Sequence, residues 1–390
     1  MSSIPSELIS TIIDELQHDR ASLKACSVVA TPFCSPSQRH LFRSMWLHRE
    51  NWQYYTVVQQ ALHRGTDTPA RTIKRASALL LEAPHLATYV RDLTIDLPDS
   101  VDEDAPLAHV LHEVGPHLER FVISGLVVRW SDLSQSLASA ILDVSARRTL
   151  NTLHLLHLRE LPATVVLRAL STVRVLSLHS LTFYEDHKEA PATISRPRLE
   201  HLILSTSLPA TYELILSPHA PKPANVTKLS LRVDATAHLY AERLLSSIAP
   251  TLVDLDLDCE ELFIPLYLPH LPHLRTLTLR IFLGLARRLP DGFAGTLRGL
   301  PRVALTVIFA VQCRFKEHTW VDDGPLPGLD ACQVDLNTVR CQLLFLGAPR
   351  AIMKEAAFHA FCAAMGAALS GVRLDLSNVE DKPYVARLPW

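Results

Sequence analysis

Three aspartates alternate along one short segment, Asp254-x-Asp256-x-Asp258. Carboxylate oxygens are the ligands that calcium and magnesium prefer, so the pattern first indicates a metal site. In a β-strand, however, the first and last of these residues lie about 13 Å apart, at a rise of about 3.3 Å per residue, which is too far for one ion. The basic residues at matching positions of neighbouring segments are Lys228, Arg232 and Arg280. They can neutralise the aspartates without a metal, so we expect a charged binding surface with no metal and no cofactor.

Other patterns that could perform catalysis are weak or missing in the sequence. His270 and His273 lie close together, but two histidines without a third ligand are weak support for a zinc site. The chain contains no G-x-S-x-G, H-E-x-x-H, Walker A or G-x-G-x-x-G motif, and only 12 glycines from which to build a phosphate-binding loop. We assign no catalytic residue and expect a protein that binds partners and is not an enzyme.

The composition narrows the class of partner and the compartment. The 390 residues carry a net charge of −2, which does not favour nucleic acid or an anionic membrane as the main partner. The 7 cysteines include no C-x-x-C pair, which argues against a disulfide framework and indicates free thiols in a reducing compartment. No stretch reaches the roughly 18–20 apolar residues of a membrane-spanning helix, and no secretory signal is visible. We therefore expect a cytoplasmic or nuclear location.

The elements that must position these side chains follow from a repeated apolar pattern, L-x-x-L-x-L. Its clearest copies have leucine at 150/153/155, 199/202/204, 252/255/257 and 274/277/279, and related copies are centred on Leu93, Phe121, Leu176 and Leu229. The middle positions of successive copies are 22 to 32 residues apart. Such an interval is typical of leucine-rich repeats, in which each unit supplies one short parallel strand and a helix or irregular return. No unit can bury its apolar face alone, so the units must stack as a solenoid. The expected fold class is α/β, with parallel strands on the concave face and helices or irregular returns outside.

Strand alternation assigns the charged residues to one face of this sheet. Because the leucines face the core, the residues between them lie on the concave face, with equivalent positions on neighbouring strands about 4.8 Å apart. The predicted partner-binding residues are His201, Lys228, Arg232, Asp254, Asp256, Asp258 and Arg280. Opposite charges then meet on adjacent strands. The alternative is that these pairs only keep the face soluble, each contributing at most about 1 kcal/mol.

The first fifty residues have a different periodicity. The apolar residues between positions 8 and 16 recur at helical spacing and predict a helix over residues 7–16. A second helix is expected after Asp19 as N-cap. A third is expected after Ser35, where S-P-S-Q has the form of a capping box with proline at N1. Three short helices in about 45 residues make a marginal core, so the module should lean on a partner or on the following domain.

The residues of this segment resemble the F-box motif. The opening I-P-S-E-L at residues 4–8, the apolar pair at 12–13 and the stretch L-K-A-C-S-V-V at 23–29 follow the family pattern, as does the aromatic Phe33. The segments R-H-L-F-R-S at 39–44 and P-H-L-A-T-Y-V-R-D-L at 84–93 also resemble fungal F-box proteins, in which the second leads into the first repeat strand.

The resemblance implies a specific role. F-box proteins dock through this module on the Skp adaptor of Skp–cullin–F-box ubiquitin ligases, and their C-terminal repeats recruit a substrate protein. Carried over residue by residue, the adaptor-binding and core residues are Ile4, Pro5, Glu7, Leu8, Ile12, Leu23, Cys26, Val28 and Phe33. The chain would then be a substrate-recognition adaptor of such a ligase. The alternative is a leucine-rich-repeat scaffold that engages no ligase, in which the first helices only cap the array.

We expect the chain to divide into an F-box at residues 1–45, a helical junction at 46–88 and a repeat solenoid at 89–390 that becomes looser after residue 300. In the junction, apolar residues recur at helical spacing over 52–62 and 73–80, and residues 45–47 could add a strand to the sheet. Further strands are expected at 305–307, 334–336 and 372–374, and a helix at 351–365. The polar segments 185–195 and 314–327 are expected to be loops.

Overall fold

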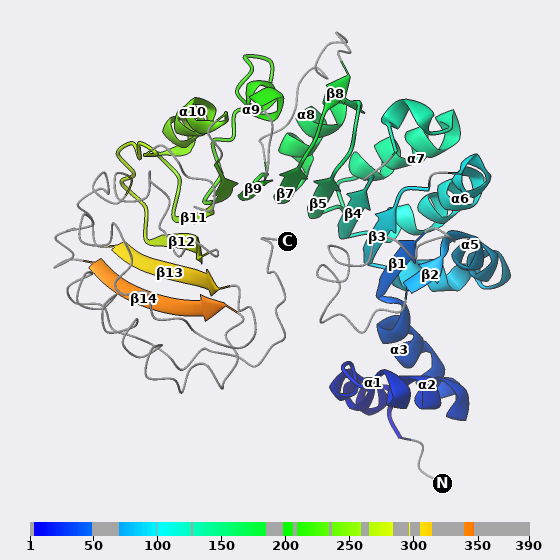
Figure 1. Cartoon of the computed structure of the whole chain (residues 1–390). Coiled ribbons are helices and arrows are strands. Elements are labelled where there is room, and N and C mark those ends of the chain that lie inside the picture. Colours follow the sequence, from blue (N-terminus) through cyan, green and yellow to red (C-terminus); the bar gives the residue numbers. More distant parts are fainter. Residues whose placement is uncertain are drawn as a thin grey trace. The chain divides into compact units, whose positions relative to one another are not determined.

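The structure is a computed structural model of the chain (Figure 1), and its contacts divide it into two compact units that are described separately here. The first unit comprises Met1–Arg174 and Leu181–Pro191, and the second comprises Val175–Ser180 and Ala192–Trp390. The residues that the structure describes are 4–48, 70–98, 100–125, 128–184, 198–205, 209–233, 236–258, 265–283, 296, 305–313 and 339–346. For residues 70–71, 280–283, 305–313 and 339–346 only the backbone is described.

The N-terminal module consists of α1 (Ser6–Glu15), α2 (Arg20–Val29) and α3 (Thr31–Phe42). α1 begins after Pro5, whose carbonyl oxygen accepts hydrogen bonds from the N–H groups of Leu8 and Ile9. α2 begins after Asp19, whose carboxylate accepts from the N–H of Ser22 at 3.1 Å, so the predicted N-cap is confirmed. The small core of the module is formed by Ile9, Ile13, Leu23 and Leu41.

The predicted start of the third helix is wrong. α3 begins about one turn earlier, so Ser35 and Pro36 lie inside it. Pro32 takes a position in the first turn, where the missing N–H costs nothing, and this allows the helix to begin before the expected capping box. The hydroxyl of Ser35 does not cap the helix but shares a hydrogen bond with the phenol oxygen of Tyr89, 3.0 Å away.

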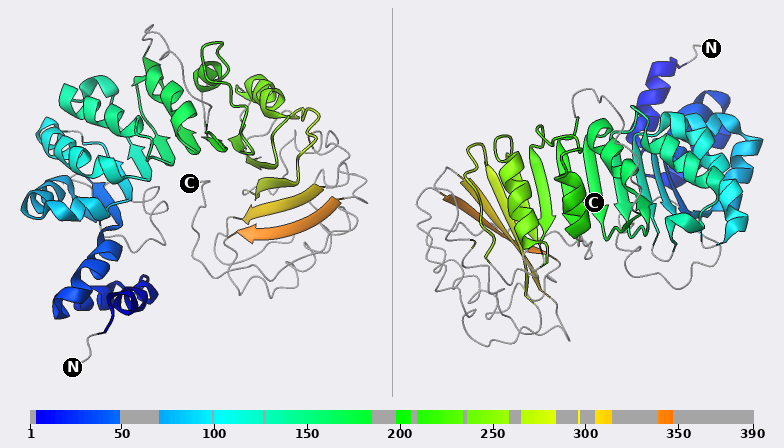
Figure 2. Two further views of the ribbon diagram at one scale, coloured as in Figure 1. Left: turned by 180° about the vertical axis from the view of Figure 1, so that it is seen from behind. Right: turned by 90° about the horizontal axis from the view of Figure 1, so that it is seen from above.

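Parallel strands and helices alternate through the rest of the first unit. The strands, in their order across the sheet, are β2 (Ala70–Thr72), β1 (Ser44–His48), β3 (Asp92–Asp96), β4 (Arg120–Ser124) and β5 (Thr152–Leu156). Along one side of these strands lie α5 (Ile73–Glu82), α6 (Asp104–Val114), α7 (Gln135–Ser145) and α8 (Ala163–Thr172), as Figures 1 and 2 show. Short 3-10 helices join them: η2 (Pro84–Tyr89), η3 (Val101–Glu103), η4 (Gly115–His117) and η5 (Trp130–Asp132). A separate parallel pair is formed by β6 (Leu161–Pro162) and β8 (Phe183–Tyr184).

One backbone contact recurs at the start of several strands. The carbonyl oxygen of Arg43 accepts from the N–H groups of both Arg91 and Asp92, at 2.8 and 3.0 Å, and the carbonyl oxygen of Arg91 accepts in the same way from Glu119 and Arg120. The same contact occurs at the start of four further strands, where the acceptors are the carbonyl oxygens of Glu119, Glu200, Thr227 and Val253. The same double hydrogen bond therefore precedes six of the described strands, whereas the carbonyl oxygen of Asn151 accepts only from the N–H of Arg174.

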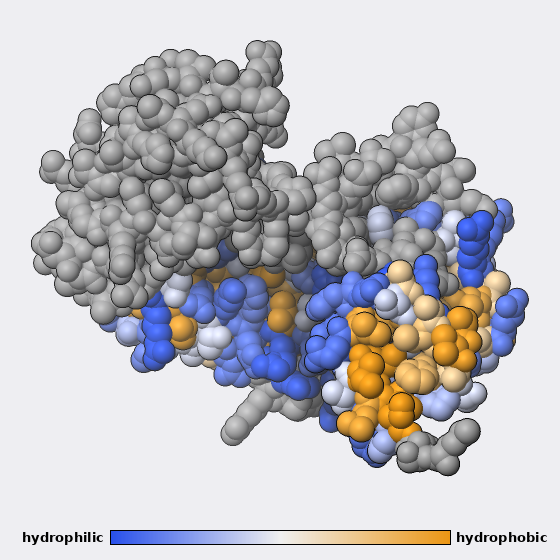
Figure 3. Space-filling view, turned by 90° about the horizontal axis from the view of Figure 1, so that it is seen from below, coloured by the Kyte–Doolittle hydropathy of each residue, from blue (hydrophilic) through white to orange (hydrophobic). Residues whose placement is uncertain are grey.

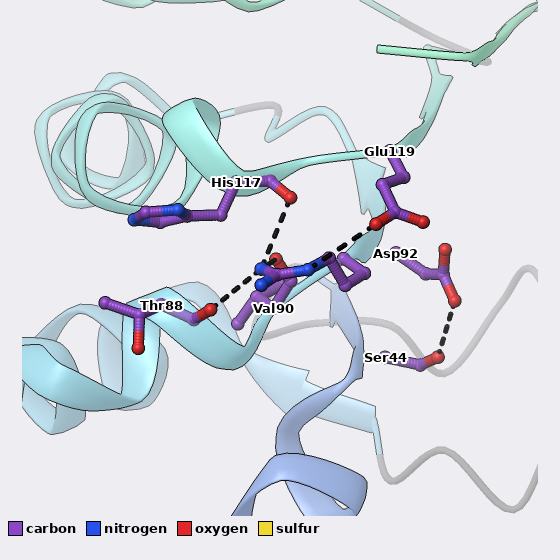
Figure 4. Close-up of polar contacts among 7 residues, drawn as sticks. Ser44, Thr88, Val90, Asp92, His117 and Glu119 are labelled. Atoms are coloured by element: carbon purple, nitrogen blue, oxygen red, sulfur yellow. Dashed lines mark hydrogen bonds and ion pairs between the residues drawn. The ribbon is translucent and has the colours of Figure 1, made fainter. Parts of the chain in front are cut away.

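The side chain of Arg91 reinforces this junction. Its Nη1 donates to the carbonyl oxygens of Thr88, Val90 and His117 at 2.7, 3.1 and 3.4 Å, and its Nε lies 3.6 Å from a carboxylate oxygen of Glu119 (Figure 4). A guanidinium with this many donors can satisfy carbonyl groups left open at the ends of both η2 and η4.

The second unit continues the alternation. Its parallel strands, each paired with the next, are β7 (Val175–His179), β9 (His201–Ser205), β10 (Lys228–Arg232), β11 (Asp254–Asp258), β12 (Thr276–Leu283), β13 (Leu305–Cys313) and β14 (Val339–Leu346). Its described helices are α9 (Pro209–Ile215) and α10 (His238–Ile248), which lie on one side of the neighbouring strands (Figure 1).

The expected α/β class with parallel strands is confirmed. Each of the L-x-x-L-x-L copies falls on a strand, and their core positions, such as Leu153, Leu202, Leu255 and Leu277, are buried. The strand expected at 45–47 is β1, the helix expected around 73–80 is α5, and the strand expected at 305–307 begins β13. β14 was not predicted. The elements expected at 52–62, 185–195, 314–327, 334–336, 351–365 and 372–374 lie outside the described residues. Within the described part, no helix has the length and apolar character needed to cross a membrane.

Candidate interaction surfaces

The N-terminal module carries apolar side chains on its outside as well as in its core. Leu8 and Ile12 follow Ile4 at intervals of one helical turn, so they share one side of α1, whereas Ile9 and Ile13 face the core. At the end of α2, Val28 and Val29 are also exposed, and the five outward side chains are between 51% and 83% exposed: Ile4, Leu8, Ile12, Val28 and Val29. We call these five residues the apolar patch. The orange surface in Figure 3 shows apolar side chains gathered on this module.

The structure sorts the predicted adaptor-binding residues into two groups. Leu23 is buried in the module core, and Cys26 and Phe33 pack against that core. These three residues therefore hold the helices together, which leaves the contact surface to the exposed residues Ile4, Pro5, Glu7, Leu8, Ile12 and Val28. Val29 is 73% exposed as well, but it was not among the predicted adaptor-binding residues. The signal that could have found it is the uninterrupted pair of valines at the last two positions of α2.

The charged residues predicted on the sheet are brought together in the second unit. Lys228 on β10 is the register partner of Asp254 on β11, and Arg232 is the partner of Asp258. Asp256 stands opposite Ser230 between these two pairs. On the other side of β11, the backbone register pairs Asp258 with residue 280 of β12. The predicted alternation of charge across adjacent strands is therefore present, and we call the residues at 201, 228, 232, 254, 256, 258 and 280 the charged band.

Burial varies along the strands that carry the charged band. The central positions Ser177, Ile203 and Ser230 are buried, although the prediction placed them on an open face. Lys228 is exposed and Asp254 is partly exposed at the first position of their strands. Arg232, Asp256 and Asp258 are partly exposed as well, so charge remains accessible along the length of β10 and β11.

His201 is the member of the charged band whose environment changes its chemistry most. Its Nε2 lies 3.2 Å from the hydroxyl oxygen of Ser230. Burial lowers the pKa of His201 to about 4, with a further lowering by the charge of Lys228 and a partial opposite effect of Asp256 and Asp254. The imidazole is therefore neutral at pH 7.

Among the described residues, no group of three or more histidine, cysteine, aspartate or glutamate side chains is arranged to hold a metal ion. No protein-family model matches the chain, and the search among curated proteins found no match.

Proposed function

We propose that the chain is a substrate-recognition adaptor of a Skp–cullin–F-box ubiquitin ligase. In this proposal the N-terminal module is an F-box whose apolar patch binds the Skp adaptor, and the strands with their L-x-x-L-x-L pattern are leucine-rich repeats that bind a substrate protein. The observation that carries the proposal is the apolar patch itself, which lies on helices whose sequence resembles the F-box. Such an adaptor performs no chemistry. It raises the effective concentration of the substrate near the ligating enzyme.

The exposure of the patch supports docking over a role as a plain helical cap. A cap needs apolar residues only on the side that packs against the array, and here Ile9, Ile13, Leu23 and Leu41 already provide an internal core. Further apolar side chains on the outside are unfavourable in water unless a partner covers them. Fully burying each of these side chains contributes about 1.5–3 kcal/mol, so a partner that covers several of them could bind tightly.

The charged band supports the second half of the proposal. Lys228 and Asp254 lie side by side on adjacent strands, and Lys228 is exposed to a partner. A substrate segment that carries both an acidic and a basic residue could pair with both at once. Complementary charges of this kind determine partner choice and association rate more than raw affinity.

The docking half is tested by co-purification of the full chain with a Skp adaptor. The wild-type chain should retain the adaptor, and the double variant Leu8→Asp with Val28→Asp should lose it. The control is Leu239→Asp, which places the same charge on another strongly exposed apolar position, on α10. All three proteins should have the same circular dichroism spectrum, because none of the changed side chains is buried. Adaptor binding by the folded double variant would refute the patch assignment, and a wild-type chain that binds no adaptor would favour the scaffold alternative.

A further inference from the structure

Three short segments of the first unit, taken from different places in the sequence, are joined by backbone hydrogen bonds. The N–H of Trp130, in the loop after β4, donates to the carbonyl oxygen of Arg159 at 2.9 Å, and Arg129 forms a parallel bridge with Arg159. The loop after β5 continues into β6, which pairs with β8 through Leu161 and Phe183 (Figure 1). Residues 128–132, 157–162 and 181–184 therefore lie next to one another, and we call them the loop cluster.

The backbone of the loop cluster is held in an unusual conformation. His157 and Glu160 have φ values of 54° and 55°, in the left-handed region that side chains disfavour. Thr182 fixes this conformation, because its hydroxyl accepts from the N–H of Glu160 at 3.0 Å and its carbonyl oxygen accepts from Leu161 at 2.9 Å. Strained backbone that its surroundings hold in place is frequent at binding sites, where it fixes the side chains in advance.

The acidic side chains of the loop cluster form hydrogen bonds and an ion pair with other residues of the cluster. One carboxylate oxygen of Glu160 accepts from the Ser131 hydroxyl at 2.7 Å, and the other lies 3.7 Å from the Arg129 guanidinium. The carboxylate of Asp132 accepts from the backbone N–H of Arg129 at 3.3 Å. The carboxylates thus stabilise the loops themselves.

The basic side chains are left available. The Arg129 side chain is 60% exposed, although it has the long contact with Glu160. Arg159 is exposed, and its guanidinium makes no hydrogen bond or ion pair with any residue that the structure describes. Tyr184, the register partner of Pro162 on β8, is 63% exposed, and Trp130 is partly exposed.

We propose that the loop cluster is a second protein-binding surface and that its partner is an acidic segment that also carries apolar side chains. Arginine, tyrosine and tryptophan are the residues that dominate binding energy in protein interfaces. A guanidinium binds a carboxylate strongly through paired hydrogen bonds, and Arg129 and Arg159 are bridge partners along the backbone. The fixed loops lose little freedom on binding, which favours affinity. A nucleic acid fits less well, because two arginines beside two carboxylates do not make the basic surface that a phosphate backbone requires.

This surface shares no residue with the apolar patch or the charged band, so its test does not depend on the proposed ligase role. The probe is a fluorescein-labelled peptide in which glutamate alternates with leucine and phenylalanine, and its twin has glutamine in place of every glutamate. Fluorescence anisotropy with the full chain should show binding of the acidic peptide, weakened by salt, and at least about tenfold weaker binding of the twin. Equal binding of both peptides would overturn the proposal.

Variants of the full chain locate the binding. Arg129→Glu with Arg159→Glu should weaken binding of the acidic peptide at least about tenfold. Arg129→Lys with Arg159→Lys should weaken this binding less, because lysine keeps the charge but not the geometry of the paired hydrogen bonds. The matched control is Arg75→Glu with Arg243→Glu, two exposed arginines on α5 and α10, which should bind as the wild type does. Unchanged binding by the first variant, or an equal loss in the control, would show that the peptide binds elsewhere.

Discussion

The indole nitrogen of Trp46 donates a hydrogen bond to the carboxylate of Asp96 across 3.3 Å, and both side chains are buried. Trp46 lies on β1, directly after the three-helix module, and Asp96 ends β3, the first strand with the repeat pattern. The contact therefore ties the strand that follows the module to the repeats in the first unit. A buried carboxylate is costly unless donors surround it, so this indole N–H is important for the position of β1.

Trp46→Phe should destabilise the chain by about 1–3 kcal/mol, because it removes a donor from a buried carboxylate while it keeps most of the apolar volume. Asp96→Asn, which retains an acceptor oxygen, should cost less. Urea denaturation followed by circular dichroism measures both. A phenylalanine variant as stable as the wild type would show that the other partners of Asp96 are sufficient.

Two alanine variants of the N-terminal module, one of a core residue and one of a surface residue, should differ clearly in stability. Ile13→Ala removes a fully buried side chain and should cost about 2–4 kcal/mol, whereas Leu8→Ala, on the exposed side of the same helix, should change stability by less than about 0.5 kcal/mol. Thermal denaturation of the two variants gives the comparison. A large loss in Leu8→Ala would mean that the patch is packed against another part of the chain.

Stability should depend on pH through His201. Its pKa is about 4 in the folded chain and near 6.5 when unfolded, so between these values the unfolded chain binds a proton that the folded chain does not. Stability should therefore fall as the pH falls through this window, by up to about 1.4 kcal/mol per pH unit. His201→Gln should show a weaker dependence when urea midpoints are compared at about pH 7 and about pH 5. An identical slope in the variant would assign the effect to other groups.

Ser180, directly after β7, has a φ of 49°, a backbone conformation that favours glycine at this position. Ser180→Gly should stabilise the chain by about 0.5–1 kcal/mol, because glycine adopts this conformation without a steric penalty. Ser180→Val should destabilise it by about 1–2 kcal/mol, because a branched side chain is least compatible with positive φ. The order glycine, serine, valine in melting temperature checks the argument, and any other order contradicts it.

Reversal of charge in the charged band should affect partners and not folding. Asp256→Arg with Asp258→Arg should leave the circular dichroism spectrum unchanged and reduce the partners recovered by proximity labelling. These residues are only partly buried, so the folded chain should tolerate the change. Recovery of the same partners at the same yield would show that the charged band is not the surface that binds them.

The repeat strands could be predicted from the sequence because the signal is local. Each strand needs buried side chains at fixed positions, and leucines such as Leu153 and Leu155 provide them in a pattern that no helix produces. The register of Lys228 with Asp254 followed from the same pattern, because the repeats align their leucines. The first two helices of the module were found for a similar reason, from apolar periodicity and the cap at Asp19.

What the sequence could not show depends on contacts between distant segments. The start of α3 was missed because Pro32 and Pro36 are both compatible with a first turn, and only packing against α2 and η2 chooses between them. The burial of Ser177 and Ser230 was missed because alternation assigns a residue to a face but does not show what covers that face. The loop cluster has no sequence signature, since its strained residues are a histidine and a glutamate where glycine is the usual choice.

The double hydrogen bond from one carbonyl oxygen to two successive N–H groups is made by backbone atoms, so it places no demand on the side chains that flank it. A unit could therefore be deleted or duplicated, and the units on either side would meet through the same atoms. Evolution could change the length of the sheet by a whole strand with its return segment, while each junction of this kind stayed chemically the same.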